Sequence, residues 1–299
     1  QLMTSKQYGW DNIPMQMSHT ILAALDFGGE VKIPYSDYQQ GIVTESYPVN
    51  GEGDIAKLRM PDPKNAGRIP KAKEFARLQV ENGLSPWFYS RSPFTMAANM
   101  AGIQQFCRWT LKKPDLCHEL IKLALSHCLD VIRDWVATFN AEDLFINMSS
   151  PNESNQLISP KQFEKFALPY HIEYHEYLRK MGVKRFYFHI CGDQNLNLPY
   201  FAEVSLWPHP SILSFGPEVD LEIAAKYFPK DIIFGNIDPA VVQTGSPQDV
   251  YELSRIAIKK GKKASGGFVL GTGCVLPKAA PPLNVFAMTR AVNDFGWYE

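Results

Sequence analysis

The chain has 299 residues, of which 45% are hydrophobic and 20% are charged, and its net charge is -1. This composition supports a large folded core and excludes disorder as the main state, because disordered chains combine low hydrophobicity with high net charge. The balance of 30 basic and 31 acidic residues gives no reason to expect a nucleic-acid partner. No run of about 18 apolar residues is present, so we expect no membrane span.

Short apolar runs alternate with longer helical patterns along most of the chain. A first strand, interrupted by Pro14, is predicted at residues 10–17. Six further strands are predicted at residues 86–91, 143–148, 184–190, 211–215, 231–235 and 267–271. The aromatic residues of these strands, Trp87, Phe88, Tyr89 and Tyr187, are predicted to belong to the core.

Three helices have clear sequence signals. A long apolar pattern predicts a helix over residues 114–139. Ser159 followed by Pro160 predicts a helix start, with serine as the N-cap and proline in the first turn, and this helix is expected to run to about Met181. Ser246 and Pro247 open another helix in the same way, which is expected to end near Gly261.

Strands that alternate with helices predict a parallel sheet with right-handed crossovers. Seven strands in this length favour a (β/α)8 barrel over an open, doubly wound sheet. No Gly-x-Gly-x-x-Gly follows an early strand, which disfavours a dinucleotide-binding fold. We expect a single barrel domain over residues 1–299, with a hairpin-like excursion at about residues 28–68.

The five cysteines are Cys107, Cys117, Cys128, Cys191 and Cys274. An odd number, widely spaced in a large chain, argues against a disulfide framework and favours free thiols in a reducing cytoplasm. No signal peptide is visible at the start of the sequence. The first three cysteines lie on helical patterns and are predicted to be structural.

The segment around His189 carries the sharpest chemical signal. His189 and Cys191 are two residues apart at the end of a predicted strand, so their side chains should lie on the same side. Cys274 follows the end of the strand at residues 267–271. In a barrel, the C-terminal ends of all strands open on one rim, where active sites are built.

One imidazole and two thiolates are suitable ligands for zinc, and three protein ligands leave a fourth position open, as in catalytic zinc sites. Such a zinc can bind a substrate thiol and lower its pKa. The alternative is that the histidine and the cysteines are ordinary buried residues, which both types often are.

Four segments resemble the uroporphyrinogen decarboxylase superfamily, and within it the zinc-dependent corrinoid methyltransferases of the methylcobamide:coenzyme M methyltransferase type. They are the helix start at residues 157–170, the His-Ile-Cys-Gly of residues 189–192, the strand end at residues 234–239, and residues 271–277 followed by Pro281-Pro282-x-Asn284.

This resemblance implies a (β/α)8 barrel in which His189, Cys191 and Cys274 bind zinc. It further implies that a methyl group passes from a methyl-corrinoid to a thiol such as coenzyme M or homocysteine. An acidic fourth ligand is expected at Glu218, with Asp220 as the second choice. The alternative role for Glu218 is a carboxylate at a helix start. The corrinoid is expected on a separate carrier protein, because the chain has no Asp-x-His-x-x-Gly corrinoid motif.

Further polar residues follow the predicted strands and are expected to bind substrate or to orient the metal ligands. They are Arg91, Asn147, Ser149, Gln194, Asn236 and Asp238. The alternative for Asp238, which precedes Pro239, is a turn residue.

Two other functions stay open on the sequence alone. One is a uroporphyrinogen decarboxylase-like tetrapyrrole decarboxylase, although the arginine-rich N-terminal motif of that branch is absent. The other is a non-catalytic regulator that binds a corrinoid protein. The family's first barrel strand has no clear counterpart here, so either the chain lacks it or the strand count is one too low.

Overall fold

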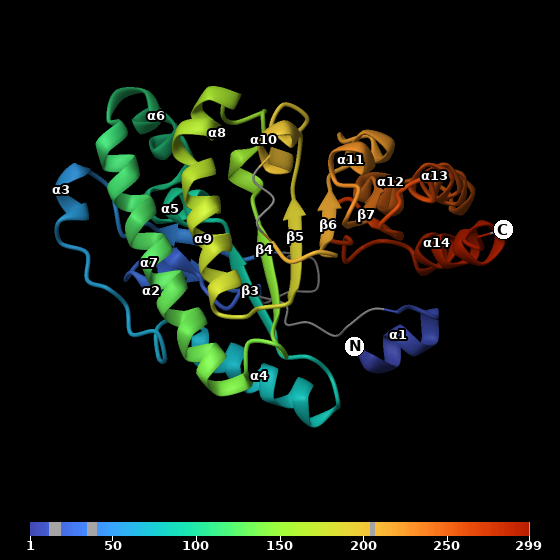
Figure 1. Cartoon of the computed structure of the whole chain (residues 1–299), viewed down its shortest axis with the longest axis horizontal. Helices are drawn as coiled ribbons and strands as arrows, with labels where there is room; N and C mark the ends of the chain where they lie inside the picture. Colours follow the sequence, from blue (N-terminus) through green and yellow to red (C-terminus); the bar gives the residue numbers. More distant parts are fainter. Residues whose placement is uncertain (12–18, 35–40, 204–206, 299) are drawn as a thin grey trace.

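A six-stranded parallel sheet forms the centre of the structure, a computed structural model that describes residues 1–11, 19–34, 41–203 and 207–298 (Figure 1). The strands lie in the order of the sequence: β3 (Trp87–Arg91), β4 (Phe145–Ser149), β5 (Arg185–Ile190), β6 (Ile212–Phe215), β7 (Ile232–Ile237) and β8 (Phe268–Thr272). Six predicted strands are thereby confirmed. The strand predicted at residues 10–17 falls largely outside the described residues.

Consecutive parallel strands, each joined to the next by helical crossovers, are the pattern of a (β/α)8 barrel. The described strands form six neighbouring positions of such a barrel. The fold class predicted from the sequence is therefore confirmed as a partial barrel. β7 extends two residues beyond its predicted end at Gly235, so Asn236 lies within the strand rather than after it.

Eleven helices of the described chain follow the hairpin region and surround the sheet (Figure 1). They are α4 (Ile69–Glu81), α5 (Pro93–Ala101), α6 (Ile103–Lys112), α7 (Pro114–Phe139), α8 (Pro160–Phe166), α9 (Leu168–Lys180), α10 (Leu198–Glu203), α11 (Leu221–Tyr227), α12 (Pro239–Thr244), α13 (Pro247–Gly261) and α14 (Pro282–Phe295). A short 3-10 helix, η1 (Pro151–Glu153), follows β4. The predicted bounds of α7 and the predicted start and end of α13 are confirmed.

The helix predicted from Ser159 to about Met181 is wrong in one respect, because the structure divides it into α8 and α9. Ser159 caps α8 as predicted, its hydroxyl accepting a hydrogen bond from the Gln162 amide. The break falls at Ala167, two residues before Pro169. Proline has no amide hydrogen to donate and disfavours helical geometry at the residue before it, so a new helix begins there.

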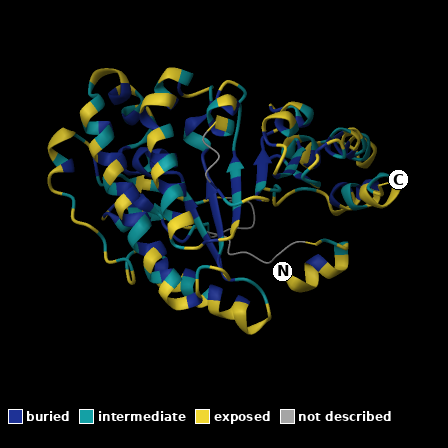
Figure 2. Ribbon diagram, viewed as in Figure 1, coloured by how far each residue is buried: buried dark blue, intermediate teal, exposed yellow. Residues whose placement is uncertain are grey.

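The two faces of the sheet differ in chemistry. The outer face is mostly apolar, and nine of its side chains on β3 to β7 are at most 1% exposed beneath the helices (Figure 2): Phe88, Ile146, Met148, Phe186, Phe188, Ile190, Leu213, Phe215 and Ile233. The ring of Phe88 packs edge-on against Trp135 of α7, and Phe188 packs against His171 of α9. This burial supplies the main stabilisation of the fold.

The opposite face, called here the inner face, is more polar. Strand alternation and the strand register place on it Trp87, Tyr89, Arg91, Phe145, Asn147, Ser149, Arg185, Tyr187, His189, Ile212, Ser214, Ile232, Phe234 and Asn236. One row crosses the C-terminal ends of four strands, pairing Arg91 with Ser149, Ser149 with His189 and His189 with Ser214. The polar residues of the inner face therefore gather at that end.

The N-terminal part contributes α1 (Leu2–Tyr8), α2 (Ala23–Asp26) and an antiparallel hairpin of β1 (Glu30–Lys32) and β2 (Val43–Ser46), followed by α3 (Glu52–Ile55). The hairpin expected at about residues 28–68 is present in the first half of that segment.

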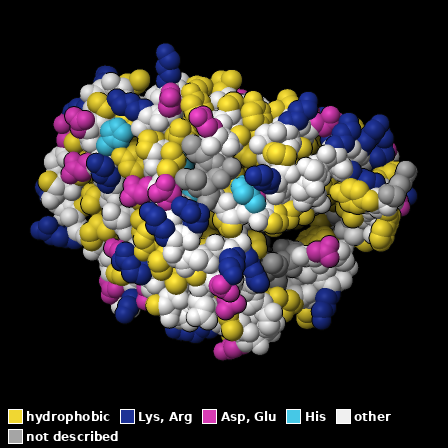
Figure 3. Space-filling model, viewed as in Figure 1, with side chains coloured by type: hydrophobic (Ala, Val, Ile, Leu, Met, Phe, Trp, Pro, Cys, Tyr) yellow, Lys and Arg dark blue, Asp and Glu magenta, His cyan; other side chains and the backbone are white. Residues whose placement is uncertain are grey.

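All five cysteines are free, as predicted, and Cys117 and Cys128 are buried in α7. Basic and acidic side chains are interspersed on the face shown in Figure 3. Among the helices in the described ranges, none combines the length and the apolar character needed to cross a membrane.

Candidate metal centre

Three ligand side chains converge at the C-terminal end of the inner face. His189 is the second-last residue of β5, Cys191 follows that strand, and Cys274 follows β8. Their ligand atoms all lie within 4.8 Å of one another. The structure thus brings together the three residues that the sequence analysis assigned to zinc.

The spacing of the two sulfur atoms agrees with a shared tetrahedral metal ion. The Sγ atoms of Cys191 and Cys274 are 3.9 Å apart. Zinc–sulfur bonds of about 2.3 Å at the tetrahedral angle would separate two sulfurs by about 3.8 Å. Soft thiolates with an imidazole form a donor set that suits zinc. These residues therefore fit the ion that the resemblance implies.

Glycines allow the loops that carry the cysteines to approach closely. A Cβ atom on Gly216, just after β6, would lie 2.9 Å from the amide nitrogen of Gly192. A Cβ atom on Gly273 would lie 2.7 Å from the Cδ atom of Pro217. Both distances are shorter than real Cβ contacts allow. The loops after β5, β6 and β8 therefore depend on these glycines to pack together.

Ser214 orients the imidazole of His189. Its hydroxyl lies 3.0 Å from the Nδ1 atom of His189, the neighbouring residue across the sheet. A histidine that binds a metal usually donates the N–H of its second ring nitrogen to a neighbouring oxygen, and this hydrogen bond fixes the tautomer and the ring plane. With Nδ1 engaged in this way, Nε2 is the nitrogen left for the metal.

The two cysteines behave as one coupled acid. The thiolate of Cys274 accepts hydrogen bonds from Cys191 and His189, which lowers the pKa of Cys274 to about 4. The hydrogen bond to Cys274, and then burial, raise the pKa of the Cys191 thiol, whereas the positive charge of Arg91 lowers it. The first proton therefore leaves the pair easily and the second with difficulty, unless a cation joins them.

The two acidic candidates for a fourth ligand have different surroundings. Asp220 is the N-cap of α11: its carboxylate accepts hydrogen bonds from the amides of Glu222 and Ile223 and pairs with Lys260 at 2.6 Å. The helix-start role considered for Glu218 thus belongs to Asp220. Glu218 is exposed, lies outside the three-residue cluster, and places a carboxylate oxygen beside Gly216.

Three of the predicted polar residues hold the main chain at this end of the barrel. Gln194 is fully buried and donates to the carbonyl oxygens of Ser150 and Cys191, both at 3.2 Å. Asn236 donates to the carbonyl oxygens of Gly216 and Val219, which flank Glu218. Gln194 and Asn236 therefore position the loops that carry Cys191 and Glu218.

Asp238, the third of these residues, is the N-cap of α12. Its carboxylate accepts a hydrogen bond of 2.8 Å from the amide of Ala240. This is the local, structural arrangement that the sequence analysis considered as its alternative.

The remaining predicted residues, Arg91, Asn147 and Ser149, lie on the inner face beside the cluster. Asn147 is 3% exposed, and among the described residues its Oδ1 atom has no hydrogen-bond partner. Burial raises the pKa of the Tyr89 phenol, and the buried hydroxyl of Ser149 close to it lowers that pKa in part. Arg91 and Asn147 are therefore available to a bound molecule.

Sequence reasoning missed His19 and the position of Tyr89. The ring of His19 stacks on Tyr89 with centroids 3.9 Å apart. Tyr89 is only partly buried, and it lies on the inner face near both cluster cysteines rather than in the predicted core. Strand parity could have placed Tyr89 there, because it is two residues from Arg91. No local signal marks His19.

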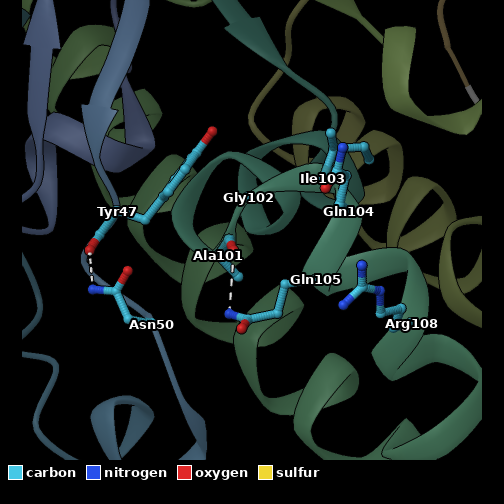
Figure 4. Close-up of a pocket in the computed structure, with 8 residues that line it drawn as sticks. All are labelled: Tyr47, Asn50, Ala101, Gly102, Ile103, Gln104, Gln105 and Arg108. Atoms are coloured by element: carbon cyan, nitrogen blue, oxygen red, sulfur yellow. Dashed lines mark hydrogen bonds between the residues drawn. The ribbon is translucent and has the colours of Figure 1, made fainter.

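A surface cavity of about 380 Å³ lies elsewhere, at the junction of α5 and α6 (Figure 4). Its polar lining consists of Tyr47, Asn50, Gln104, Gln105 and Arg108. The amides of Asn50 and Gln105 donate to main-chain carbonyl oxygens of Tyr47 and Ala101. The cavity contains none of the cluster residues.

Comparisons with known proteins identify a matching family and several related methyltransferases. A family model described as uroporphyrinogen decarboxylase matches residues 1–295. A methylated-thiol–coenzyme M methyltransferase of Methanosarcina mazei is 27% identical over 68% of this chain, and the match spans only 51% of that relative. The methylcobamide:CoM methyltransferase MtbA of the same organism is 29% identical over 96% of this chain and 80% of the relative.

A solved structure of a methyltransferase from Methanosarcina mazei has the same fold. It superimposes with a TM-score of 0.81 at 19% identity, covering 99% of this chain and 84% of the other.

Proposed function

The chain belongs to the uroporphyrinogen decarboxylase family, and within that family we propose that it is a zinc-dependent methyltransferase. The methyl donor is a methyl-corrinoid carried by a partner protein, and the acceptor is a small thiol such as coenzyme M or homocysteine. The single observation that carries the proposal is the convergence of His189, Cys191 and Cys274. The names of the relatives, methylcobamide:CoM and methylated-thiol–coenzyme M methyltransferases, support the same chemistry.

His189, Cys191 and Cys274 would hold the zinc ion. When bound there, zinc supplies a positive charge that lowers the pKa of an incoming thiol and so provides a thiolate nucleophile. Ser214 keeps the His189 ring in one orientation, and Gln194 fixes the main chain at Cys191. These contacts hold the ligands in place before the substrate arrives.

The transfer itself is a displacement at the methyl carbon. The sulfur–carbon bond forms as the cobalt–carbon bond breaks, and the bonding electron pair stays on the corrinoid. The proton of the acceptor thiol passes to solvent. The corrinoid reaches this end of the barrel on its carrier protein, and residues 1–299 contain no Asp-x-His-x-x-Gly motif.

The test is an assay of methyl transfer from methylcobalamin to a thiol. The reaction is monitored by the absorbance change of the corrinoid and by the amount of methylated thiol formed. We expect turnover by wild type and its loss in Cys274→Ala and His189→Ala. Cys107→Ala removes a half-buried thiol outside the cluster and is the matched control. Full activity in Cys274→Ala would contradict the proposal. Decarboxylation of a porphyrinogen that survives metal chelation would replace it with the decarboxylase function.

A further inference from the structure

Unpartnered polar groups gather on the inner face next to the metal cluster. Arg91 lies at the end of β3, and Asn147 lies on β4 one layer deeper. In the strand register, Arg91 lies opposite Ser149 of β4, and Ser149 lies opposite His189 of β5. Since neighbouring strands are about 4.8 Å apart, the main chain of Arg91 is about 10 Å from that of His189. A short molecule can therefore span from the cluster to Arg91.

Arg91 is a half-buried cation without an acidic partner. Within the described ranges, no hydrogen bond or ion pair reaches its guanidinium group, whereas other cations such as Lys260 and Lys73 pair with acids. Cations withdrawn from water are rarely left unpaired, and a planar guanidinium is suited to two-point binding of an acid group.

One further buried polar atom near Arg91, the Nε2 atom of His19, has no hydrogen-bond partner among the described residues. Buried polar atoms are nearly always hydrogen-bonded, so this unsatisfied atom indicates a missing partner. Asn147 lies one layer deeper, opposite Tyr89, and the NH2 group of its amide is the part of the side chain that can donate to an acid group. The ring of His19 stacks on Tyr89, two residues before Arg91 on the same face. The charge of Arg91 also acts on His19, where it adds to burial in lowering the pKa.

We propose that Arg91, with Asn147 and His19 beside it, binds the anionic group of the acceptor thiol and selects thiols that carry a sulfonate or carboxylate over neutral ones. This inference rests on the proposed function, since it places the thiol end of the same molecule at His189, Cys191 and Cys274. The NH2 group of Asn147 and the ring N–H of His19 donate the remaining hydrogen bonds to the bound acid group.

The first test compares three acceptors in the methyl-transfer assay: 2-mercaptoethanesulfonate, homocysteine and neutral 2-mercaptoethanol. Arg91→Met keeps the length of the side chain and removes its charge. We expect this variant to raise KM for the anionic thiols about 10- to 100-fold, the range for loss of a charged hydrogen bond, and to raise KM for 2-mercaptoethanol far less. Arg91→Lys should recover part of the loss. A preference for one anionic thiol over the other in wild type would distinguish sulfonate from carboxylate.

Arg185→Met is the matched control. Arg185 lies on the inner face at the opposite end of β5, where it donates to the Ser85 hydroxyl. This variant should change KM for none of the thiols. An equal loss for all three thiols in Arg91→Met would assign Arg91 a purely structural role and overturn the proposal, as would wild-type indifference between charged and neutral thiols.

A second measurement does not depend on turnover. Ethanesulfonate has the acid group without the thiol, and its binding can be followed by calorimetry. We expect binding to wild type and to Arg185→Met, and none to Arg91→Met. If methyl transfer is absent altogether, the proposed function fails, but ethanesulfonate binding that requires Arg91 would still support the anion site. Absence of binding to folded wild type would overturn the anion site even if methyl transfer is observed.

Discussion

The Sγ atoms of Cys191 and Cys274 lie 3.9 Å apart although 83 positions separate the two residues in the sequence. Each cysteine follows a different strand of the sheet, and the parallel arrangement brings both strand ends to one side. This close approach of the two thiols forms the centre of the candidate metal site.

Ser214→Ala should weaken zinc binding without unfolding the protein. The variant removes the hydroxyl that holds Nδ1 of His189, and loss of such a partner typically lowers metal affinity 10- to 100-fold. Zinc competition with a chromogenic chelator measures the affinity. Ser90→Ala is the matched control, because Ser90 lies on the outer face and contacts Tyr174 instead. Equal zinc affinity in Ser214→Ala and wild type would show that Ser214 does not orient the ligand.

Gly216→Ala should disturb the metal centre through packing alone. The new methyl group would lie 2.9 Å from the Gly192 amide and 2.5 Å from a carboxylate oxygen of Glu218, so the loops must separate. We expect a loss of about 1–3 kcal/mol in the free energy of unfolding, together with weaker zinc binding. A Cβ atom on Gly41 meets no atom of the described residues within 4 Å, so Gly41→Ala should change neither quantity. Urea titration and the chelator assay provide both readings. Wild-type values for Gly216→Ala would contradict the close packing.

Buried histidines should make the fold sensitive to acid. Burial, and then the charge of His171, hold the pKa of His175 well below 6.5, and burial with Arg91 does the same for His19. The unfolded chain binds these protons near pH 6.5 whereas the folded chain does not. The free energy of unfolding is therefore unaffected by these histidines above pH 6.5. As the pH falls below 6.5, it decreases by about 1.4 kcal/mol per pH unit for each histidine.

His175→Gln tests this dependence directly. The free energy of unfolding, measured in urea at several values between pH 7 and 5, should fall less steeply with acid than in wild type, by about one proton. Contributions from other groups are common to both proteins and cancel in the comparison. An identical slope in the two proteins would mean that His175 is protonated in the fold.

Much of the fold can be predicted from the sequence because its signals are local. The six strands are short apolar runs, and the helix starts at Ser159 and Ser246 carry a cap followed by proline. The pair of His189 and Cys191 follows from strand alternation. Pro169 is a local signal for the break between α8 and α9. The apolar pattern continues across that break, and for this reason a single helix was predicted.

The remaining features depend on contacts between distant segments. Neither the stacking of His19 on Tyr89 nor the close approach of Gly216 to Gly192 leaves a pattern in the nearby sequence. Gln194 and Asn236 were expected to bind substrate or to orient the metal ligands, and in the structure their amide groups donate to main-chain carbonyl oxygens, for Gln194 that of Cys191. A polar residue after a strand can serve a ligand or a loop, and only the folded geometry distinguishes these roles.

The most direct test of the central claim is the zinc content of the freshly purified, reduced protein, measured by elemental analysis for wild type, Cys191→Ser and the control Cys107→Ser. We expect about one zinc per chain in wild type and in the control, and its loss in Cys191→Ser. Folded wild type without zinc, or a Cys191→Ser variant that retains it, would contradict the assignment of His189, Cys191 and Cys274 as a zinc site.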